Sequence, residues 1–556
     1  DAEAFGGWED LSCQLRGHFL GHWLSAAALH YQETEDVELK AKTEVILKEL
    51  ELCQKDNGGE WVCPIPEKYL YWIGKGRNIW APQYNIHKLF MGLIDVYRMM
   101  EQPKALSIAD KLADWFYRWS GRYTREEFDD ILDMETGGML EVWADLYEIT
   151  GQEKYKILMQ RYYRSRLFEP LLEGKDVLTN MHANTTIPEV LGCAKAYEVT
   201  GEEKWLHIVE QYWKCAVIDR GCFATGGQTQ GEIWTPMKKL KAGRLGDKNQ
   251  EHCTVYNMIR LAEFLFRQTK DPAYMHYIEY NVQNGIMAQT YCPEGGLLTY
   301  FLPMKAASRK EWAGERDSFF CCHGTMVQAN AAWNHRLYYQ EDDHLYVTMY
   351  ADSQVSFEMQ GRKICLTQNQ DYMNGSLMTC SENNAKQTIN ETVSAYANKP
   401  DFRKYVFTIH TQEDTPFHLM LRIPDWIRED AMVYINDDLY VKTNNTAKFV
   451  AINRVWRNDD KVTVLLPIGL KFIPLPDDAS MGAYRYGADV LAGITEKERI
   501  LKLETEKPED ELSADTERPW GEFRTFYRTE NQDPGISFKK LNEIGNEPYQ
   551  IYFKVK

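Results

Sequence analysis

The sequence predicts a multidomain α+β protein, in which an array of helical hairpins precedes one or more β-sandwich domains. Three observations support this prediction: helical spacing of apolar residues as far as about Gln340, a phrase that recurs within that part, and alternation of apolar and polar residues from about His344. The chain has 556 residues, of which 44% are hydrophobic and 26% charged. This composition suits two to four globular domains with sizeable cores.

The helical part carries apolar residues on one face of each expected helix. The clearest segments are "VELKAKTEVILKELELC", "NIHKLFMGLIDVYRMM" and "TVYNMIRLAEFLFRQT". In the last of these, one face of a helix would hold Val255, Met258, Ile259, Ala262 and Leu265.

A recurring phrase marks the period of this helical part. It reads "YRMMEQPKAL" from Tyr97, "YEITGQEKYK" from Tyr147 and "YEVTGEEKWL" from Tyr197, with a looser copy, "FRQTKDPAYM", from Phe266. The three tyrosines are 50 residues apart (147 − 97 and 197 − 147). Each phrase is typical of a helix end, a turn with Gly or Pro and the next helix start, so one period holds one helical hairpin. Such an array is an open solenoid or a closed α/α toroid, and we favour closure because no polar capping repeat is evident.

Strand patterns begin near His344 and continue to the end of the sequence. They include "HLYVTMY", "KYVFTIH", "FHLMLRIP" and "DKVTVLLPI", which indicate a β-sandwich, and then "GAYRYGADVLAGI" and "PYQIYFKV". We therefore expect a helical domain over residues 1–342, a β-sandwich over residues 343–478 and a β-rich segment or small second β-domain over residues 479–556.

Charge and composition limit the classes of partner. The formal net charge of −18 argues against nucleic acid and anionic membranes, since both require a basic face. No apolar run reaches the ~20 residues of a membrane span. Sixteen Trp and 33 Tyr provide aromatic faces that suit sugar rings. Twelve cysteines without a regular framework, behind an N-terminus that lacks a signal-peptide pattern, predict free or metal-bound thiols and a cytoplasmic protein. The sequence leaves the oligomeric state open, a homodimer included.

Adjacent cysteines, Cys321 and Cys322, offer the most specific chemistry. A disulfide between neighbours is strained, so the pair is either core filling or a set of metal ligands with one potential nucleophile. The segment "NQEHCTVYNM" adds Glu251 and Cys253, which completes a possible Cys3Glu set of the kind that zinc accepts. For all four to converge, we expect Glu251 and Cys253 to precede a helix and the cysteine pair to lie in irregular backbone.

Several motifs together resemble a known family. They are "RGHFLGHWLSA", "PQYNIHKLFMGLIDVY", "ETGGMLEVWADLYEITG", "MHANTTIPEVLG", "EHCTVYNMIRLAEFLF", the vicinal cysteines, "LRIPDW" and "YRYGADVLAG". In this order, over nearly the whole chain, they resemble glycoside hydrolase family 127 and its sister family 146, the retaining β-L-arabinofuranosidases. The resemblance implies an (α/α)6 barrel followed by β-sandwich domains. It also implies a zinc-dependent exo-glycosidase with a cysteine nucleophile, which releases terminal β-L-arabinofuranose or a related furanose from plant-type glycans.

The resemblance also assigns roles to individual residues. It implies that the zinc ligands are Glu251, Cys253, Cys321 and Cys322, and that Cys321 is the nucleophile. Glu232, in "TQGEIW", matches the general acid/base, and a sugar pocket would be lined by His87, His182 and Tyr300.

Other functions remain open at this level. One is a hydrolase of a branched acidic furanose of pectin, whose carboxylate would meet an arginine such as Arg77 or Arg316. Another is a non-catalytic sugar-binding protein with a structural zinc, since four protein ligands close a tetrahedral site. A third is an α/α-toroid epimerase or lyase that uses His or Tyr and no zinc. His18 and His22, four residues apart, are best interpreted as buried or pocket-lining histidines.

Overall fold

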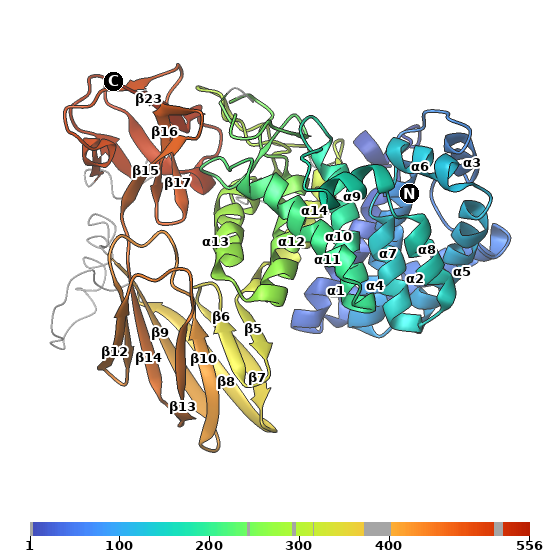
Figure 1. Ribbon diagram of the computed structural model, residues 1–556, viewed down its shortest axis with the longest axis horizontal. Helices are drawn as coiled ribbons and strands as arrows, with labels where there is room; N and C mark the ends of the chain where they lie inside the picture. The colour runs from blue at the N-terminus through green and yellow to red at the C-terminus, as the bar shows by residue number, and fades with distance from the viewer. Residues whose placement is uncertain (1–3, 242–244, 292–295, 315, 372–401, 516–525) are drawn as a thin grey trace.

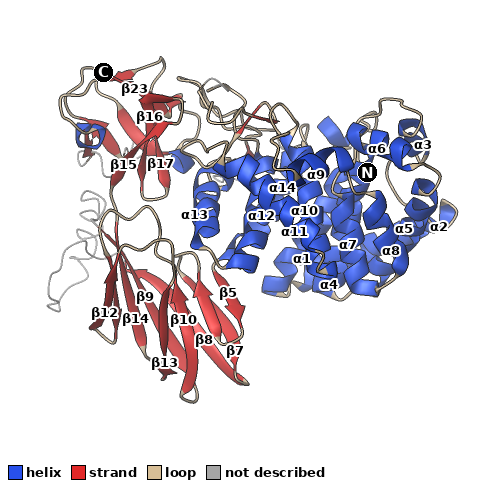
Figure 2. Cartoon of the chain, viewed as in Figure 1, coloured by secondary structure: helices blue, strands red, loops and turns tan. Residues whose placement is uncertain are grey.

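The computed structural model of the chain describes residues 4–241, 245–291, 296–314, 316–371, 402–515 and 526–556. The helices from the N-terminus to α14 gather on one side, and two sheet-rich regions lie on the other (Figures 1 and 2). The helical region contains long helices, the shorter α3 (Lys68–Ile73), α6 (Arg125–Met134) and α9 (Ser165–Leu172), and small turns such as η1 (Gly7–Glu9).

Six long helices form a closed ring in which each packs on the next and the last packs on the first. They are α1 (His18–Thr34), α4 (Pro82–Met100), α7 (Met139–Thr150), α10 (Ala183–Thr200), α12 (His252–Thr269) and α14 (Cys321–Ala331). Five of them are followed by an outer helix: α2 (Val37–Asp56), α5 (Pro103–Ser120), α8 (Glu153–Arg161), α11 (Glu203–Trp213) and α13 (Pro272–Asn281). The ring confirms the closed toroid over the open solenoid.

The recurring phrase of the sequence is the turn from an inner helix to its outer partner. The residue that follows each of the inner helices α4, α7, α10 and α12 has a left-handed backbone, with φ of 55° at Glu101, 65° at Gly151, 67° at Gly201 and 56° at Lys270. A left-handed residue ends a helix sharply and lets the chain reverse within two or three residues. The shared turn therefore explains the constant spacing.

Close packing of α1 on α4 depends on two glycines. A Cβ atom on Gly21 would lie 2.0 Å from the carbonyl oxygen of Lys88, and one on Gly92 would lie 2.5 Å from that of Gly21. Because nothing larger than hydrogen fits there, the two backbones approach directly. The first turns of the inner helices meet at one end of the ring, where His18 of α1 lies 3.4 Å from the hydroxyl of Tyr84 in α4.

The β-sandwich follows the helical ring. Its four-stranded sheet has the order β13-β10-β6-β5 and its six-stranded sheet the order β12-β11-β14-β9-β8-β7. The strands are β5 (Tyr338–Glu341), β6 (His344–Val347), β7 (Ser353–Met359), β8 (Arg362–Asp371), β9 (Phe402–Thr411), β10 (Thr415–Leu421), β11 (Ala431–Ile435), β12 (Asp438–Thr443), β13 (Val450–Trp456) and β14 (Lys461–Pro467). Alternate residues, such as Leu419 and Val464, are buried between the sheets, as the sequence pattern predicted.

A nine-stranded sheet completes the described chain, with the order β18-β23-β16-β17-β21-β20-β19, β15 paired with β16 and β22 with β17. Its strands are β15 (Leu470–Leu475), β16 (Asp478–Tyr486), β17 (Asp489–Ile494), β18 (Ile500–Leu501), β19 (Leu512–Ala514), β20 (Tyr527–Thr529), β21 (Ser537–Lys540), β22 (Tyr549–Gln550) and β23 (Tyr552–Val555). The domain boundaries at residues 342 and 478 stay predictions.

Two of the sequence motifs attach the sheets to the helices. In "LRIPDW", the buried guanidinium of Arg422 pairs with Glu279 of α13 at 2.9 Å, and the indole of Trp426 donates to the same carboxylate. In "YRYGADVLAG", Ala488 and Val490 exchange backbone hydrogen bonds with the side chain of Asn284. These contacts hold the helical region against both sheet-rich regions. In the part of the chain that the structure describes, no helix is long and apolar enough to cross a membrane.

Candidate active site and metal centre

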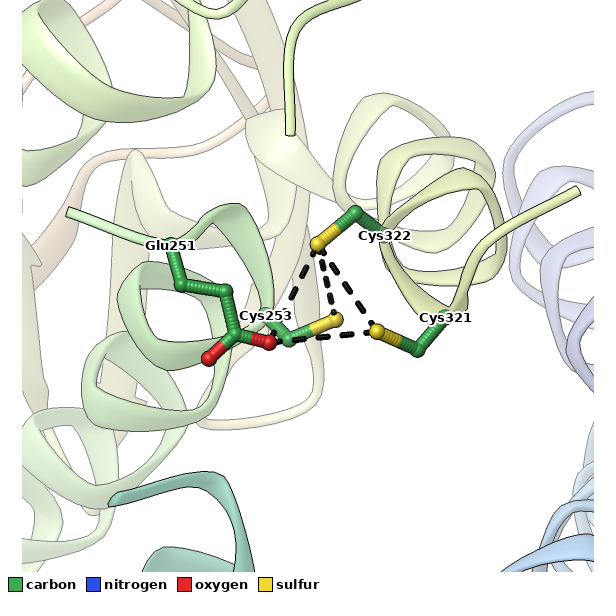
Figure 3. A group of neighbouring side chains, drawn as sticks. All are labelled: Glu251, Cys253, Cys321 and Cys322. Atoms are coloured by element: carbon green, nitrogen blue, oxygen red, sulfur yellow. Dashed lines mark hydrogen bonds between the residues drawn. The ribbon is translucent and has the colours of Figure 1, made fainter. Parts of the chain in front are cut away.

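Glu251, Cys253, Cys321 and Cys322 form a buried cluster at the end of the ring where the inner helices begin. Glu251 is the N-cap of α12, Cys253 lies in its first turn, and the two adjacent cysteines begin α14. The side chains from the two helices point toward one another (Figure 3). The sulfurs of Cys253 and Cys322 are 3.3 Å apart, those of Cys321 and Cys322 are 3.9 Å apart, and Glu251 Oε1 lies 3.8 Å from the sulfur of Cys321.

The backbone that brings the cysteine pair together differs from the expectation. We expected irregular backbone, but Cys321 and Cys322 are the first two residues of a helix. Successive side chains on a helix diverge by only about 100°, against about 180° on a strand, so both sulfurs reach one point from regular structure. The expectation for Glu251 is correct, since it precedes the helix with non-helical backbone, whereas Cys253 already lies inside it.

The cluster fits a tetrahedral zinc ion. Bond lengths of about 2.3 Å to sulfur and 2.1 Å to oxygen place tetrahedral donors roughly 3.6–3.8 Å apart, close to the spacings between these side chains. Thr254 donates to Glu251 Oε2 at 2.8 Å, which leaves Oε1 directed at the sulfurs. The Thr325 hydroxyl lies 3.2 Å from the sulfur of Cys253. One carboxylate and three thiols, buried and oriented by neighbouring hydroxyls, are a donor set suited to this ion.

Cys321 differs from the other two cysteines in acidity. Burial opposes its ionisation, but the side-chain contacts with Cys253, Cys322 and Tyr300 outweigh burial and hold the pKa of Cys321 well below its usual range. Burial raises the pKa values of Cys253 and Cys322. The position of Cys321 at the start of α14 also favours a thiolate, because the positive end of the helix dipole lies there.

Glu232 lies beside the cluster, in the turn between β1 (Thr229–Gln230) and β2 (Ile233–Trp234). Its φ of 64° is left-handed. The hydroxyl of Tyr300 donates to Glu232 Oε1 and lies 3.3 Å from the sulfur of Cys321. On its other side, Glu232 Oε2 lies 3.1 Å from Nε2 of His182, the N-cap of α10. The structure thus links Glu232, His182 and Tyr300 to Cys321 in one chain of contacts.

Tyr300 is held as a hydrogen-bond donor. Burial, together with the negative charge of Cys321, raises its pKa far above the ordinary value of tyrosine. Its backbone carbonyl accepts from the backbone N–H of His252 at 3.1 Å, which ties the segment to the start of α12. The side chain therefore stays protonated between the carboxylate and the sulfur.

His87 is the one predicted pocket residue that the described contacts do not connect to the others. It lies in α4, is 2% exposed, and its Nδ1 has no hydrogen-bond partner among the described residues. A Cβ atom on Gly138, at the start of α7, would lie 2.4 Å from its Nε2. Burial lowers the pKa of His87 well below its ordinary value, so the ring is neutral.

Sequence reasoning missed Tyr84 and Lys88, both in α4. The Tyr84 hydroxyl lies 3.4 Å from His18 Nδ1 and from His22 Nε2, and the ammonium of Lys88 lies 4.9 Å from the centre of the Tyr84 ring. The two histidines are buried, as expected; His18 also contacts the carbonyl of Phe319 at 2.8 Å. The signal in the sequence that could have identified them is the spacing of four residues between Tyr84 and Lys88, which places them on one face of a helix.

Comparisons with family models cover most of the chain. A family model described as the catalytic domain of the family 127 β-L-arabinofuranosidases matches residues 1–335, and the model of their middle domain matches residues 344–468. A search of curated proteins finds no match.

Solved structures show a similar fold over the whole chain. One is a family 127 β-L-arabinofuranosidase from Geobacillus stearothermophilus T6, with a TM-score of 0.71 and 17% identity over 100% of this chain and 92% of that one. Another is a family 127 β-arabinofuranosidase, with a TM-score of 0.72 and 17% identity over 100% of this chain and 89% of that one. At this identity they support the fold, a helical (α/α)6 barrel followed by β domains.

Proposed function

The chain belongs to glycoside hydrolase family 127, and from this premise we propose that it is a retaining exo-glycosidase with Cys321 as nucleophile and Glu232 as general acid/base. The proposed substrate is a glycan that ends in β-L-arabinofuranose or a closely related furanose. One observation carries the proposal: the Tyr300 hydroxyl contacts both the sulfur of Cys321 and the carboxylate of Glu232, so both groups lie within contact distance of one atom.

Retaining glycosidases use two groups, one that attacks the anomeric carbon and one that protonates the departing oxygen. In the first step the Cys321 thiolate forms a carbon–sulfur bond as the glycosidic carbon–oxygen bond breaks. Glu232 gives its proton to the leaving oxygen. Tyr300 and the start of α14 stabilise the sulfur as an anion before it attacks.

In the second step the ionised Glu232 removes a proton from water as the water oxygen attacks the anomeric carbon. The carbon–sulfur bond breaks, Cys321 leaves as a thiolate, and Glu232 is protonated again. Two inversions retain the configuration. His182 holds one oxygen of the Glu232 carboxylate at 3.1 Å and Tyr300 holds the other, which fixes the direction of proton transfer.

Glu251, Cys253, Cys321 and Cys322 would hold the zinc ion. When bound, the ion keeps the thiols deprotonated at neutral pH and makes the sulfur of Cys321 a better leaving group. The unpartnered Nδ1 of His87 suits a hydroxyl of the bound sugar.

The other candidate functions have less support. Family membership makes the chain a glycoside hydrolase, so the non-catalytic, epimerase and lyase alternatives do not hold. For the acidic furanose, the net charge of −18 disfavours a carboxylate-bearing substrate, although an arginine such as Arg77, which packs over the ring of Trp72 at 5.4 Å, keeps its N–H donors. A neutral furanose is therefore the first choice.

The test is a panel of aryl furanosides in which aryl β-L-arabinofuranoside is hydrolysed and NMR follows the first-formed anomer. We expect retention, with losses of more than about 100-fold for Cys321→Ala and Glu232→Gln. Cys193→Ala, which removes a buried thiol of α10 outside the cluster, is the matched control and should keep activity. An inverted product, or full activity in both variants, would contradict the proposal.

A further inference from the structure

Two tryptophans form an aromatic surface next to the cysteine cluster. Trp80 directly precedes Ala81, the N-cap of α4, and is 48% exposed. Its ring centre lies 4.9 Å from that of Trp8, at an angle of 74°. Among the described tryptophans, only Trp80 is exposed, and the others are buried or half-buried. Single exposed apolar side chains are common, so the exposure of Trp80 matters only through its position relative to the cysteine cluster. We call these two residues the Trp8–Trp80 pair.

The pair is connected to the catalytic groups through aromatic contacts. Trp8 packs against the small core that contains Cys253, Cys321 and Cys322. Its ring centre also lies 5.8 Å from that of Phe320, which directly precedes Cys321 and lies 5.4 Å from the ring of Tyr300. Trp80 is therefore the exposed end of a path of rings that starts beside the nucleophile.

Both tryptophans are held in place by their backbones. The backbone N–H of Trp8 donates to the carbonyl of Ser318 at 3.1 Å, and that of Gly6 donates to the carbonyl of Arg316 at 2.9 Å. The backbone N–H of Trp80 donates to the side chain of Gln14 at 2.7 Å. Since the backbones that carry both rings are ordered before a ligand arrives, binding costs little additional conformational entropy.

The proposed reaction indicates which part of the substrate would contact this surface. An exo-acting enzyme encloses the terminal furanose between Cys321 and Glu232, and the rest of the glycan must extend over exposed residues around them. His182, whose side chain is 47% exposed, contacts Glu232 directly, and Trp80 is connected to the segment of the nucleophile through Trp8 and Phe320. The net charge of −18 disfavours an acidic chain here.

We propose that the Trp8–Trp80 pair binds a neutral sugar ring of the glycan beyond the scissile bond, with Trp80 as the stacking face. This inference rests on the proposed function. It makes the enzyme prefer glycans with at least one further sugar unit over simple alkyl furanosides. The C–H face of a sugar ring covers an indole face in the way an apolar side chain does, while its hydroxyls stay in water.

The test compares a β-L-arabinofuranosyl disaccharide with methyl β-L-arabinofuranoside, which has no ring beyond the scissile oxygen. Trp80→Ala should lower kcat/KM for the disaccharide roughly fivefold, mostly through KM, as expected for the loss of one stacking contact. It should leave the methyl glycoside unchanged, and Trp80→Phe should retain most of the preference. Tyr440→Ala is the control, because Tyr440 is also 48% exposed but lies on β12 of the β-sandwich.

Equal losses on both substrates, or no loss on either, would overturn the inference. If the wild-type protein cleaves neither substrate, the proposed function fails first, and calorimetric titration with the disaccharide then tests the surface directly. Weaker binding of the disaccharide by Trp80→Ala than by Tyr440→Ala would support the sugar site, and equal binding would contradict it.

Discussion

The hydroxyl of Tyr300 lies 3.3 Å from the sulfur of Cys321. The same hydroxyl donates to Glu232, so one phenol orients the two groups proposed to carry out the chemistry. Because a phenol carries one proton, this hydroxyl donates to the carboxylate when Glu232 is ionised and is available to the sulfur anion when Glu232 is protonated.

Replacing this hydroxyl tests that role. Tyr300→Phe should lower kcat by about 10- to 100-fold with a small change in KM, because the lost contacts act on the reacting groups. Its zinc content should equal that of the wild type, since Tyr300 is not among the four donors. Tyr163→Phe, which removes a hydroxyl bound to Glu169 on the outside of the barrel, is the control. A wild-type kcat in Tyr300→Phe would show that the contact is incidental.

Removal of metal should destabilise the helical ring. The four donors join the starts of α12 and α14, and without an ion a buried carboxylate and three thiols are left facing one another. We expect a chelator to lower Tm by at least about 5 °C and to abolish hydrolysis, with both restored by added zinc. Calorimetry and metal analysis of the freshly purified protein measure this effect. An unchanged Tm together with metal-free active protein would exclude the zinc.

Gly324 is expected to tolerate no side chain. A Cβ atom there would lie 2.1 Å from the ring of His22, at the contact between α14 and α1. Gly324→Ala should therefore cost about 1–3 kcal/mol of unfolding free energy and shift the cysteine pair, which lowers zinc content as well. Denaturant unfolding and metal analysis report the two effects. Ala331→Gly, at the end of the same helix, controls for helix propensity and should keep the zinc.

The buried pair of Arg422 and Glu279 joins the β-sandwich to α13. Glu279→Gln keeps the shape but leaves a guanidinium without its counter-charge, which costs about 3–5 kcal/mol when the partner is buried. We expect a clear fall in Tm by calorimetry. Asp430→Asn, which breaks the exposed contact to Lys442 at 3.6 Å, should leave Tm nearly unchanged. Equal effects of the two variants would contradict a role for burial.

Asp95 should make stability depend on pH. Burial raises its pKa to about 7, against the opposing hydrogen bond from Ser25. Because the unfolded value is about 4, the folded state binds the proton more tightly, and this contribution to stability is lost as pH rises from about 4 to 7. Asp95→Asn should thus gain about 3 kcal/mol relative to wild type between pH 5 and pH 8. Denaturant unfolding at the two pH values measures it. Asp130→Asn, whose carboxylate is 67% exposed, should show no such gain.

The sequence predicted part of the arrangement of the barrel. The phrases at Tyr97, Tyr147 and Tyr197 predicted hairpins of equal length because each turn obeys local backbone rules, seen in the left-handed Gly151 and Gly201. Closure of the ring depends on contacts between helices distant in the sequence, such as the approach of α14 to α1 where Gly324 faces the ring of His22, and no local pattern predicts those.

The candidate site, too, was predicted in part by the sequence and decided in part by the tertiary structure. Residue types and the family resemblance pointed to Glu251, Cys253 and the cysteine pair, because few side chains bind zinc or attack carbon. The aromatic surface of Trp8 and Trp80 went unpredicted, since exposure of a tryptophan is a property of its surroundings.

Periodicity and the chemistry of single side chains depend on residues that are close in the sequence. The sequence alone therefore predicted the hairpins, the strands and the kinds of reactive group. The convergence of the reactive side chains in space could not be predicted in this way. Cys253 and Cys322 are 69 residues apart in the chain, but their sulfurs are 3.3 Å apart. That distance depends on how two helices begin at the same end of a closed ring, which packing of the whole domain decides. The pairing of Cys321 with Glu232 through Tyr300 has the same origin, because it unites three segments that share no local pattern.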